Sequence, residues 1–316
     1  GAYFVYALLS LLIIYAAYRY TKTRIILLMR LKTEHEQRVN MENMNQQKIN
    51  FFTYISHDLK TPLTLILSPL QRLIQQPQIS NNDKEKLEVI YRNANRMNYL
   101  INELLTFSKI EMKQMRISVR KGDIMHFLEE LSHIFDIVAG EREIDFIVNL
   151  EDTEEEVWFS PSKLERILYN LLSNAFKYTQ PGGYVKLSAK LIKEEKGTFV
   201  QISVKDNGRG IPKEAQEQIF ESYYQVEKRD HREGFGLGLS LTRSLIHMHK
   251  GEIRVESEIN KGSDFIVTLN VSEDAYNPDE RSSENITTEE IQKYNQRIKE
   301  TIELIPEKLT NKEKDP

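Results

Sequence analysis

The sequence predicts a multidomain protein: an N-terminal transmembrane helix, an all-α helical hairpin that becomes a four-helix bundle in a dimer, and an α+β domain built as an α/β sandwich. Three observations support this fold class. The run from Ala2 to Tyr18 carries no charge. Residues 49–104 hold apolar side chains at alternating steps of three and four, and beyond about residue 114 short β-type runs alternate with amphipathic helices. With 316 residues and 40% hydrophobic content, the chain is large enough for more than one core.

Composition narrows the function classes. The 43 Lys and Arg residues are balanced by 47 Asp and Glu residues, which gives a formal net charge of -4. A chain with this balance has no general attraction for polyanions, so we expect no nucleic-acid partner. The sequence contains no cysteine, which excludes disulfides, thiolate nucleophiles and cysteine-bound zinc.

The N-terminal segment predicts a membrane anchor. As a helix, its uncharged run spans roughly 25 Å, just short of a bilayer core, so we expect residues 1–20 to be a truncated transmembrane helix. Because the chain opens with Gly1 rather than Met, we expect the protein to extend further upstream. Cations follow the run with no acid before Glu34, and by the positive-inside rule they place everything downstream in the cytoplasm. These cations are Arg19, Lys22, Arg24, Arg30 and Lys32. Residues 21–48 then form a charged helical linker.

Residues 49–114 predict the helical hairpin. The first apolar series runs from Ile49 to Leu73, and Pro77 with the polar stretch 78–83 interrupts it before the spacing resumes from Leu87 to Leu104. Two such helices are expected to pair antiparallel. One seam per helix leaves the flanking apolar residues exposed, and pairing two hairpins would bury them. We therefore expect a homodimer.

The first helix of the hairpin presents a reactive set. His57 and Asp58 fall beside the apolar seam, and Thr61 lies one helical turn from His57 on the same face. A neighbouring carboxylate can hold one ring nitrogen of a histidine and leave the other as a nucleophile. The alternative is an exposed histidine on a charged helix, with Thr61 only capping or kinking that helix before Pro62.

Residues 115–272 carry three motifs that suit parts of a nucleotide. In KLERILYNLLSNAFKYT (163–179), Asn170, Asn174 and Lys177 share one helix face, which suits a metal–phosphate group but is also compatible with a surface amphipathic helix. VKDNGRGIP (204–212) places Asp206 at a strand end, although such a sequence is often only a tight turn. GFGLGLS (234–240) leads into a helix whose first amides suit phosphate.

The set of motifs and their order resemble bacterial sensor histidine kinases over residues 49–272. The stretch Phe51–Leu63 resembles their phosphoacceptor box, with Lys60 where arginine is more usual. The Asn-rich helix, DNGRG, IFESYYQ (219–225), GFGLGLS and GSDF (262–265) resemble their GHKL-type ATP-binding domain, a fold that also occurs in gyrase, MutL and heat-shock chaperone ATPases.

The resemblance implies a role for each matching residue. His57 would accept the phosphoryl group, Asp58 would orient it and share its proton, and Thr61 would position a water for phosphatase activity. Mg²⁺ would be held by Asn174, with Asn170 assisting. Residues 221–233 would form a mobile lid. The ATP-contacting residues would be Asn170, Asn174, Lys177 at the phosphates, Tyr178 against the adenine, Asp206 at the adenine amino group, Gly208, Gly210, Gly234, Gly236, Leu237 and Gly238.

The combined prediction is a membrane-bound sensor histidine kinase of a two-component system. It would use ATP and Mg²⁺ to phosphorylate His57 and pass the phosphoryl group to an aspartate of a response regulator receiver domain, either separate or fused downstream in a hybrid kinase. Its location would be the bacterial inner (cytoplasmic) membrane, with the catalytic region in the cytoplasm. Residues 273–316 would be a polar linker or tail with one short amphipathic helix through Ile291 and Ile298. The alternatives are a non-catalytic dimeric nucleotide-binding signalling scaffold and an ATP-driven clamp of the gyrase or MutL kind.

Overall fold

The structure is a computed structural model that describes residues 2–74, 76, 79–112, 114–153, 155–225 and 236–302. The chain divides into two compact units, residues 1–55 and residues 56–316, which are described separately. Helix α1 (Ala2–Ile74) begins in the first unit and ends in the second.

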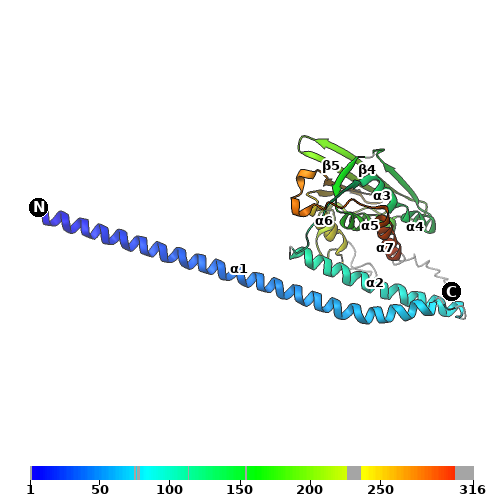
Figure 1. Ribbon diagram of the computed structural model, residues 1–316, viewed down its shortest axis with the longest axis horizontal. Coiled ribbons are helices and arrows are strands. Elements are labelled where there is room, and N and C mark those ends of the chain that lie inside the picture. The colour runs from blue at the N-terminus through cyan, green and yellow to red at the C-terminus, as the bar shows by residue number, and fades with distance from the viewer. Residues whose placement is uncertain are drawn as a thin grey trace. The chain divides into compact units, whose positions relative to one another are not determined.

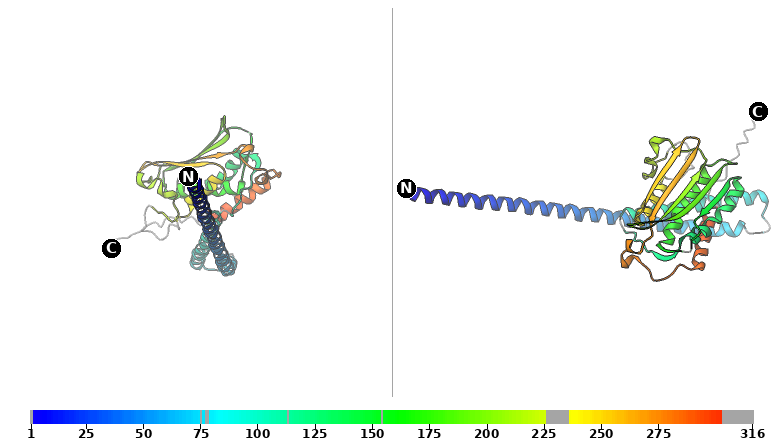
Figure 2. Two further views of the ribbon diagram at one scale, coloured as in Figure 1. Left: turned by 90° about the vertical axis from the view of Figure 1, so that its left-hand side faces the viewer. Right: turned by 90° about the horizontal axis from the view of Figure 1, so that it is seen from above.

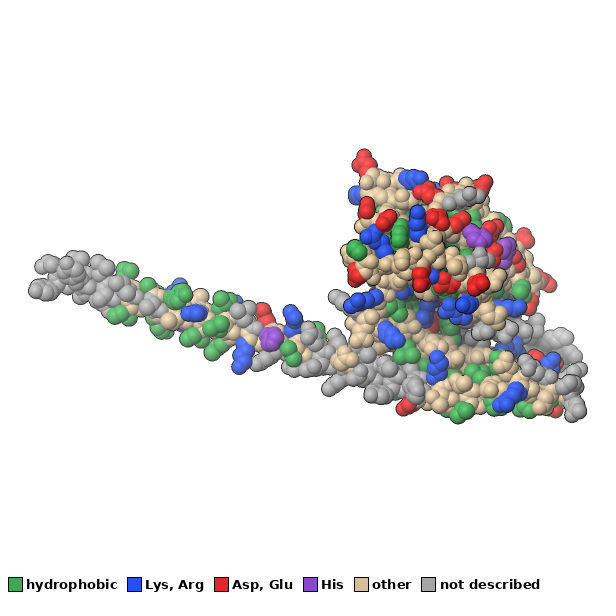
Figure 3. Space-filling view, in the orientation of Figure 1, with side chains coloured by type: hydrophobic (Ala, Val, Ile, Leu, Met, Phe, Trp, Pro, Cys, Tyr) green, Lys and Arg blue, Asp and Glu red, His purple; other side chains and the backbone are tan. Residues whose placement is uncertain are grey.

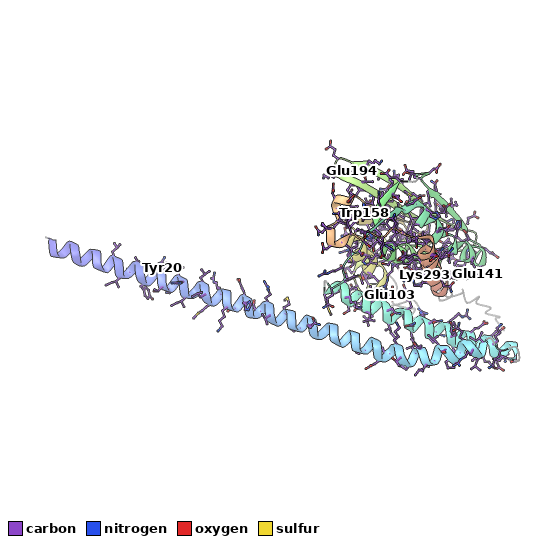
Figure 4. The ribbon with its side chains drawn as sticks, viewed as in Figure 1. Tyr20, Glu103, Glu141, Trp158, Glu194 and Lys293 are labelled. Atoms are coloured by element: carbon purple, nitrogen blue, oxygen red, sulfur yellow. The ribbon has the colours of Figure 1, made fainter. Side chains whose placement is uncertain are left out.

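The first unit contains only the helical residues of α1 (Figure 1). Apart from the half-buried Ile55, its described side chains are exposed, including Tyr18 and Tyr20, and Tyr20 projects from the helix in Figure 4. Among the described residues, none of the helices combines the length and the apolar content that crossing a bilayer requires. The transmembrane helix expected over residues 1–20 stays a prediction, because the side chains of residues 1–11 lie outside the described residues.

The predicted helical hairpin is confirmed in the second unit. The end of α1 is followed by α2 (Asn81–Glu111), whose N-cap Ser80 accepts a hydrogen bond from the Asp83 backbone N–H at 3.2 Å. Leu63, Leu70 and Ala94 are buried between the helices. Larger apolar side chains on the same hairpin stay exposed in the single chain: Leu59, Leu65, Ile66, Leu73, Val89, Ile90 and Met97. Figure 3 shows hydrophobic side chains at the surface of the hairpin. Such a surface is expected where a second hairpin packs.

The α/β domain follows the hairpin and is also confirmed. Its elements are β1 (Arg120–Asp123), α3 (Ile124–Ser132), α4 (Ile134–Arg142), β2 (Asp145–Leu150), β3 (Glu156–Phe159), α5 (Pro161–Tyr178), β4 (Tyr184–Glu194), β5 (Gly197–Asp206), two 3₁₀ turns (Lys213–Ala215 and Gln218–Phe220), α6 (Gly238–Met248), β6 (Glu252–Glu258) and β7 (Gly262–Asn270). The main sheet has the order β2-β4-β5-β7-β6, in which only the β2–β4 pair is parallel. β1 and β3 form a separate antiparallel pair.

The core of this domain lies between the main sheet and a layer of helices. The helices lie against one face of the sheet, and no described element covers the other face in the two views of Figure 2. In α5, apolar positions recur every three or four residues, and Leu164, Leu168 and Leu172 are fully buried. Alternate residues of β5 point into the same core, with Val200 and Val204 fully buried. Acidic and basic side chains alternate over the visible face of the domain (Figure 3).

The segment after β7 is folded onto the domain. Two 3₁₀ turns (Glu273–Ala275 and Pro278–Glu280) lead to α7 (Thr288–Ile302), which packs on α3, α4 and α5. The expected amphipathic helix is present, and its Ile291, Tyr294 and Ile298 belong to the main core. Arg120 and Glu290 form a two-pronged ion pair at 2.7 and 2.5 Å that holds α7 to β1. Residues 273–302 are thus a structural part of the domain rather than a free polar tail.

Candidate active site

Helices α5 and α6 meet at Asn170. This side chain is buried, and its Nδ2 donates a hydrogen bond to Thr242 Oγ1 at 2.7 Å. Its Oδ1 lies 2.6 Å from the place that a Cβ on Gly238 would occupy, so only glycine allows the start of α6 to approach this closely. Asn174 follows one helical turn later and is half-buried. The structure therefore brings Asn170 beside Gly238 at the start of α6, with Asn174 one turn further along α5.

The C-terminal end of α5 carries Lys177 and Tyr178. The Lys177 Nζ donates a hydrogen bond to Tyr178 Oη at 3.1 Å and lies 4.8 Å from the centre of its ring. Both side chains are half-buried. They are placed beyond Asn174 along the same helix, next to the loop that follows β5.

Asp206 is the last residue of β5. It is 5% exposed, and its Oδ1 accepts a hydrogen bond from the Gly208 N–H at 2.8 Å. Burial raises the pKa of its carboxyl, while hydrogen bonds from the backbone of Gly208 and Ser263 act in the opposite direction. A buried carboxylate with a fixed orientation can select a ligand that donates a hydrogen bond.

The start and end of the predicted lid are close together. The Tyr223 backbone N–H donates to the Gly236 carbonyl at 2.9 Å, and both residues have φ of 68°. A Cβ on Gly236 would lie 2.7 Å from the Tyr224 carbonyl oxygen, so this position requires glycine. The hydrogen bond between Tyr223 and Gly236 closes the base of the lid. The chain continues from there through Leu237 to Gly238 at the start of α6. Gly234 and the rest of the lid over 226–235 lie outside the described residues.

The predicted phosphoacceptor set lies on α1. His57 is within the helix, but its side chain is outside the described residues. Asp58 and Thr61 are exposed. The helix continues through Pro62, and the next turn is anchored by the buried Leu63.

The α/β domain contacts the hairpin through α2. The Tyr99 hydroxyl donates to Glu103 Oε1 at 2.9 Å, and its ring meets that of Tyr169 edge-on at 6.1 Å. Arg166 Nη1 donates to Thr106 Oγ1 at 2.8 Å. Glu103, which projects from α2 toward the domain in Figure 4, is 6% exposed. Burial raises the pKa of this carboxyl, and the Arg166 guanidinium and the Tyr99 hydroxyl partly counter the effect.

Comparison with known families agrees with this geometry. Residues 160–273 match the histidine kinase-, DNA gyrase B- and HSP90-like ATPase family, and residues 47–113 match the His Kinase A (phospho-acceptor) domain. The chain belongs to the histidine kinase family. The first matched region covers the α/β domain from α5 to β7, and the second covers the hairpin.

Several sensor kinases are similar to this histidine kinase. Histidine kinase P4 of Formosa agariphila is 33% identical over 99% of this chain and 23% of its own length. Sensor histidine kinase WalK of Bacillus subtilis is 33% identical over 74% of this chain and 38% of its own length. The chain therefore spans less than half of either relative. The crystal structure of full-length ShkA in complex with AMPPNP has the same fold, with a TM-score of 0.61, 24% identity, and coverage of 71% of this chain and 46% of that one.

Sequence reasoning missed three features of the kinase. Arg209 lies over the ring of Tyr178, α2 offers Glu103 to the α/β domain, and His249 is completely buried in the core. Arg209 is part of the DNGRG motif, but the motif does not predict its contact with the Tyr178 ring. The other two depend on elements far apart in the chain, and no local pattern marks them.

Proposed function

We propose that this histidine kinase transfers the γ-phosphoryl group of ATP to His57 and then to an aspartate of a response regulator. The observation that supports it most is the convergence of Asn170, Asn174 and Lys177 with Asp206 and the glycine-rich start of α6 at one end of the α/β domain. An ATPase domain of this family binds ATP, and the similar ShkA structure carries the ATP analogue AMPPNP.

The chemistry is a phosphoryl transfer in two steps. A ring nitrogen of His57 attacks the γ-phosphorus, the bond from that phosphorus to the β–γ bridging oxygen breaks, and ADP leaves. A carboxylate oxygen of the regulator then attacks the phosphohistidine and frees His57. Such transfers depend mainly on alignment and charge neutralisation. Asp58, adjacent in sequence, orients the imidazole and takes up the proton that it loses.

The asparagine pair fits a magnesium site. One amide hydrogen of Asn170 is used by Thr242, so its oxygen is the atom that this residue can offer to a cation. Asn174 supplies a second neutral oxygen one turn away. Mg²⁺ held by these residues would neutralise negative charge on the phosphates. Lys177 adds a fixed positive charge at the same end of α5.

The partners follow from the domains. A His Kinase A domain implies a homodimer, and kinases of this family signal to response regulators. The exposed apolar side chains of the hairpin are the proposed dimer face. We propose that the second partner is the receiver domain of a response regulator, either separate or fused downstream.

For location, we propose the cytoplasmic side of a bacterial inner membrane. The support is the cluster of cations between residues 19 and 32, which an anionic lipid surface attracts. Co-sedimentation with anionic vesicles should fall when Arg19, Lys22 and Arg24 are replaced by glutamine. Equal binding of both proteins would contradict this location.

The decisive experiment uses γ-labelled ATP. The intact chain should acquire acid-labile label, whereas His57→Gln should acquire none and should still bind ATP. Label that persists on the H57Q protein would exclude His57 as acceptor. A wild-type protein that binds ATP but takes up no label would instead support the non-catalytic scaffold.

A further inference from the structure

Tyr178 is in contact with two cations in this structure. The Arg209 Cζ lies 4.3 Å from the centre of the Tyr178 ring, inside the roughly 6 Å range in which a cation is attracted to an aromatic face. The Lys177 Nζ lies 4.8 Å from the same centre and donates to the hydroxyl. The resemblance assigns Lys177 to the phosphates but gives Arg209 no role.

The backbone around Arg209 is firmly held. Its N–H donates to the Tyr178 carbonyl at 3.4 Å, and its own carbonyl accepts from the Asn260 N–H at 2.8 Å. A Cβ on the preceding Gly208 would collide with the Tyr178 carbonyl oxygen, so the loop lies directly against the end of α5. The guanidinium therefore extends from a fixed backbone onto the ring.

The loop also fixes which part of a nucleotide Arg209 can meet. The same loop begins with Asp206, the buried carboxylate that the proposed function places at the adenine amino group, and the Gly208 N–H joins the two parts through its bond to Asp206 Oδ1. Lys177 lies one turn beyond Asn174, and the proposed function places both residues at the phosphates. The ring is thus contacted by one cation from the loop that carries Asp206 and by one from the helix that carries Asn174.

We propose that Arg209 is a base-side nucleotide-binding residue that holds the Tyr178 ring as one wall of the adenine subsite. Its guanidinium restricts the ring to one orientation before the nucleotide arrives. Lys177 leaves the ring when phosphates bind, and Arg209 stays. This inference rests on the proposed ATP binding.

The test compares three nucleotides that differ only in phosphate number. ATP, ADP and AMP are titrated by calorimetry, with Mg²⁺ present, into the full chain and its Arg209→Ala and Lys177→Ala variants. Arg209→Ala removes a base-side group, so it should weaken the binding of all three nucleotides by the same factor, about 3- to 10-fold for one cation–π contact. Removal of Lys177 should weaken ATP more than ADP and ADP more than AMP. Arg254→Ala, which removes an exposed arginine of β6, is the matched control and should change nothing.

A second measurement tests the ring itself. In a Tyr178→Leu background, Arg209→Ala should cause no further loss of affinity, because the ring that it holds is gone. Three results for Arg209→Ala would overturn the proposal: an affinity loss that grows with phosphate number, an unchanged affinity, or tighter binding. Losses that add to those of Tyr178→Leu would overturn it as well. If the wild-type chain binds none of the three nucleotides, the proposed function itself fails.

Discussion

His249 should make the stability of the α/β domain depend on pH. Its ring has no exposed surface: Nε2 accepts from the Ser160 N–H at 3.2 Å, and Nδ1 bonds to the Leu245 carbonyl at 3.0 Å. The imidazole is therefore neutral, with its proton on Nδ1. Burial lowers its pKa from 6.5 to about 4, although the bond to Leu245 acts the other way.

The direction and size of the effect follow from proton linkage. Below pH 6.5 the unfolded chain binds a proton at this histidine that the folded chain rejects until about pH 4. Stability from this group is therefore complete above pH 6.5 and declines as the pH falls toward 4. The loss at pH 5 is about 2 kcal/mol, and it approaches about 3 kcal/mol at pH 4, at about 1.4 kcal/mol per pH unit.

The measurement is urea unfolding at pH 7.5 and pH 5.0. Trp158, the single tryptophan, lies in β3 two residues before Ser160 and reports on this domain (Figure 4). The control is His249→Gln, which keeps an acceptor but does not titrate, so other titrating groups cancel in the comparison. The stability advantage of the wild type should shrink by about 2 kcal/mol between the two pH values. An advantage that stays the same would refute the assignment of a buried neutral imidazole.

Three further outcomes are expected. Asn174→Ala should reduce the rate of His57 labelling by the equivalent of about 2 to 4 kcal/mol, as for a lost preorganised electrostatic group, and an unchanged rate at saturating ATP and Mg²⁺ would contradict its role. Asp58→Asn should lose mainly autophosphorylation, about 10²- to 10⁴-fold, whereas Thr61→Ala should lose mainly dephosphorylation of the purified phosphorylated regulator; equal losses of both reactions in Thr61→Ala would contradict the division. Ile298→Ala should lower the free energy of unfolding of the α/β domain by about 3 kcal/mol in urea, because this side chain is 2% exposed, and a null effect would show that α7 is not part of the fold.

Local patterns in the sequence were sufficient to predict the helical hairpin and the nucleotide-binding motifs. The three-and-four spacing between residues 49 and 104 predicted the hairpin, because one apolar seam per helix requires burial against another helix. The order of the Asn-rich helix, DNGRG and GFGLGLS predicted the nucleotide site, because these residues act through neighbours on the same helix or turn. In the structure Asn170 bonds to Thr242, Lys177 to Tyr178, and Asp206 to the Gly208 N–H, and their roles in nucleotide binding stay predictions.

Only the tertiary structure decided the contacts between distant segments. Arg209 on Tyr178 joins a loop to a helix end 31 positions earlier, and Arg166 on Thr106 spans 60 positions. α7 was visible as an amphipathic helix, but its apolar stripe did not say whether it covers the domain or a partner. Burial of His249 likewise depends on α5, α6 and β7 meeting around it. Periodicity records which face of an element is apolar, whereas the partner of that face depends on the packing of the whole domain.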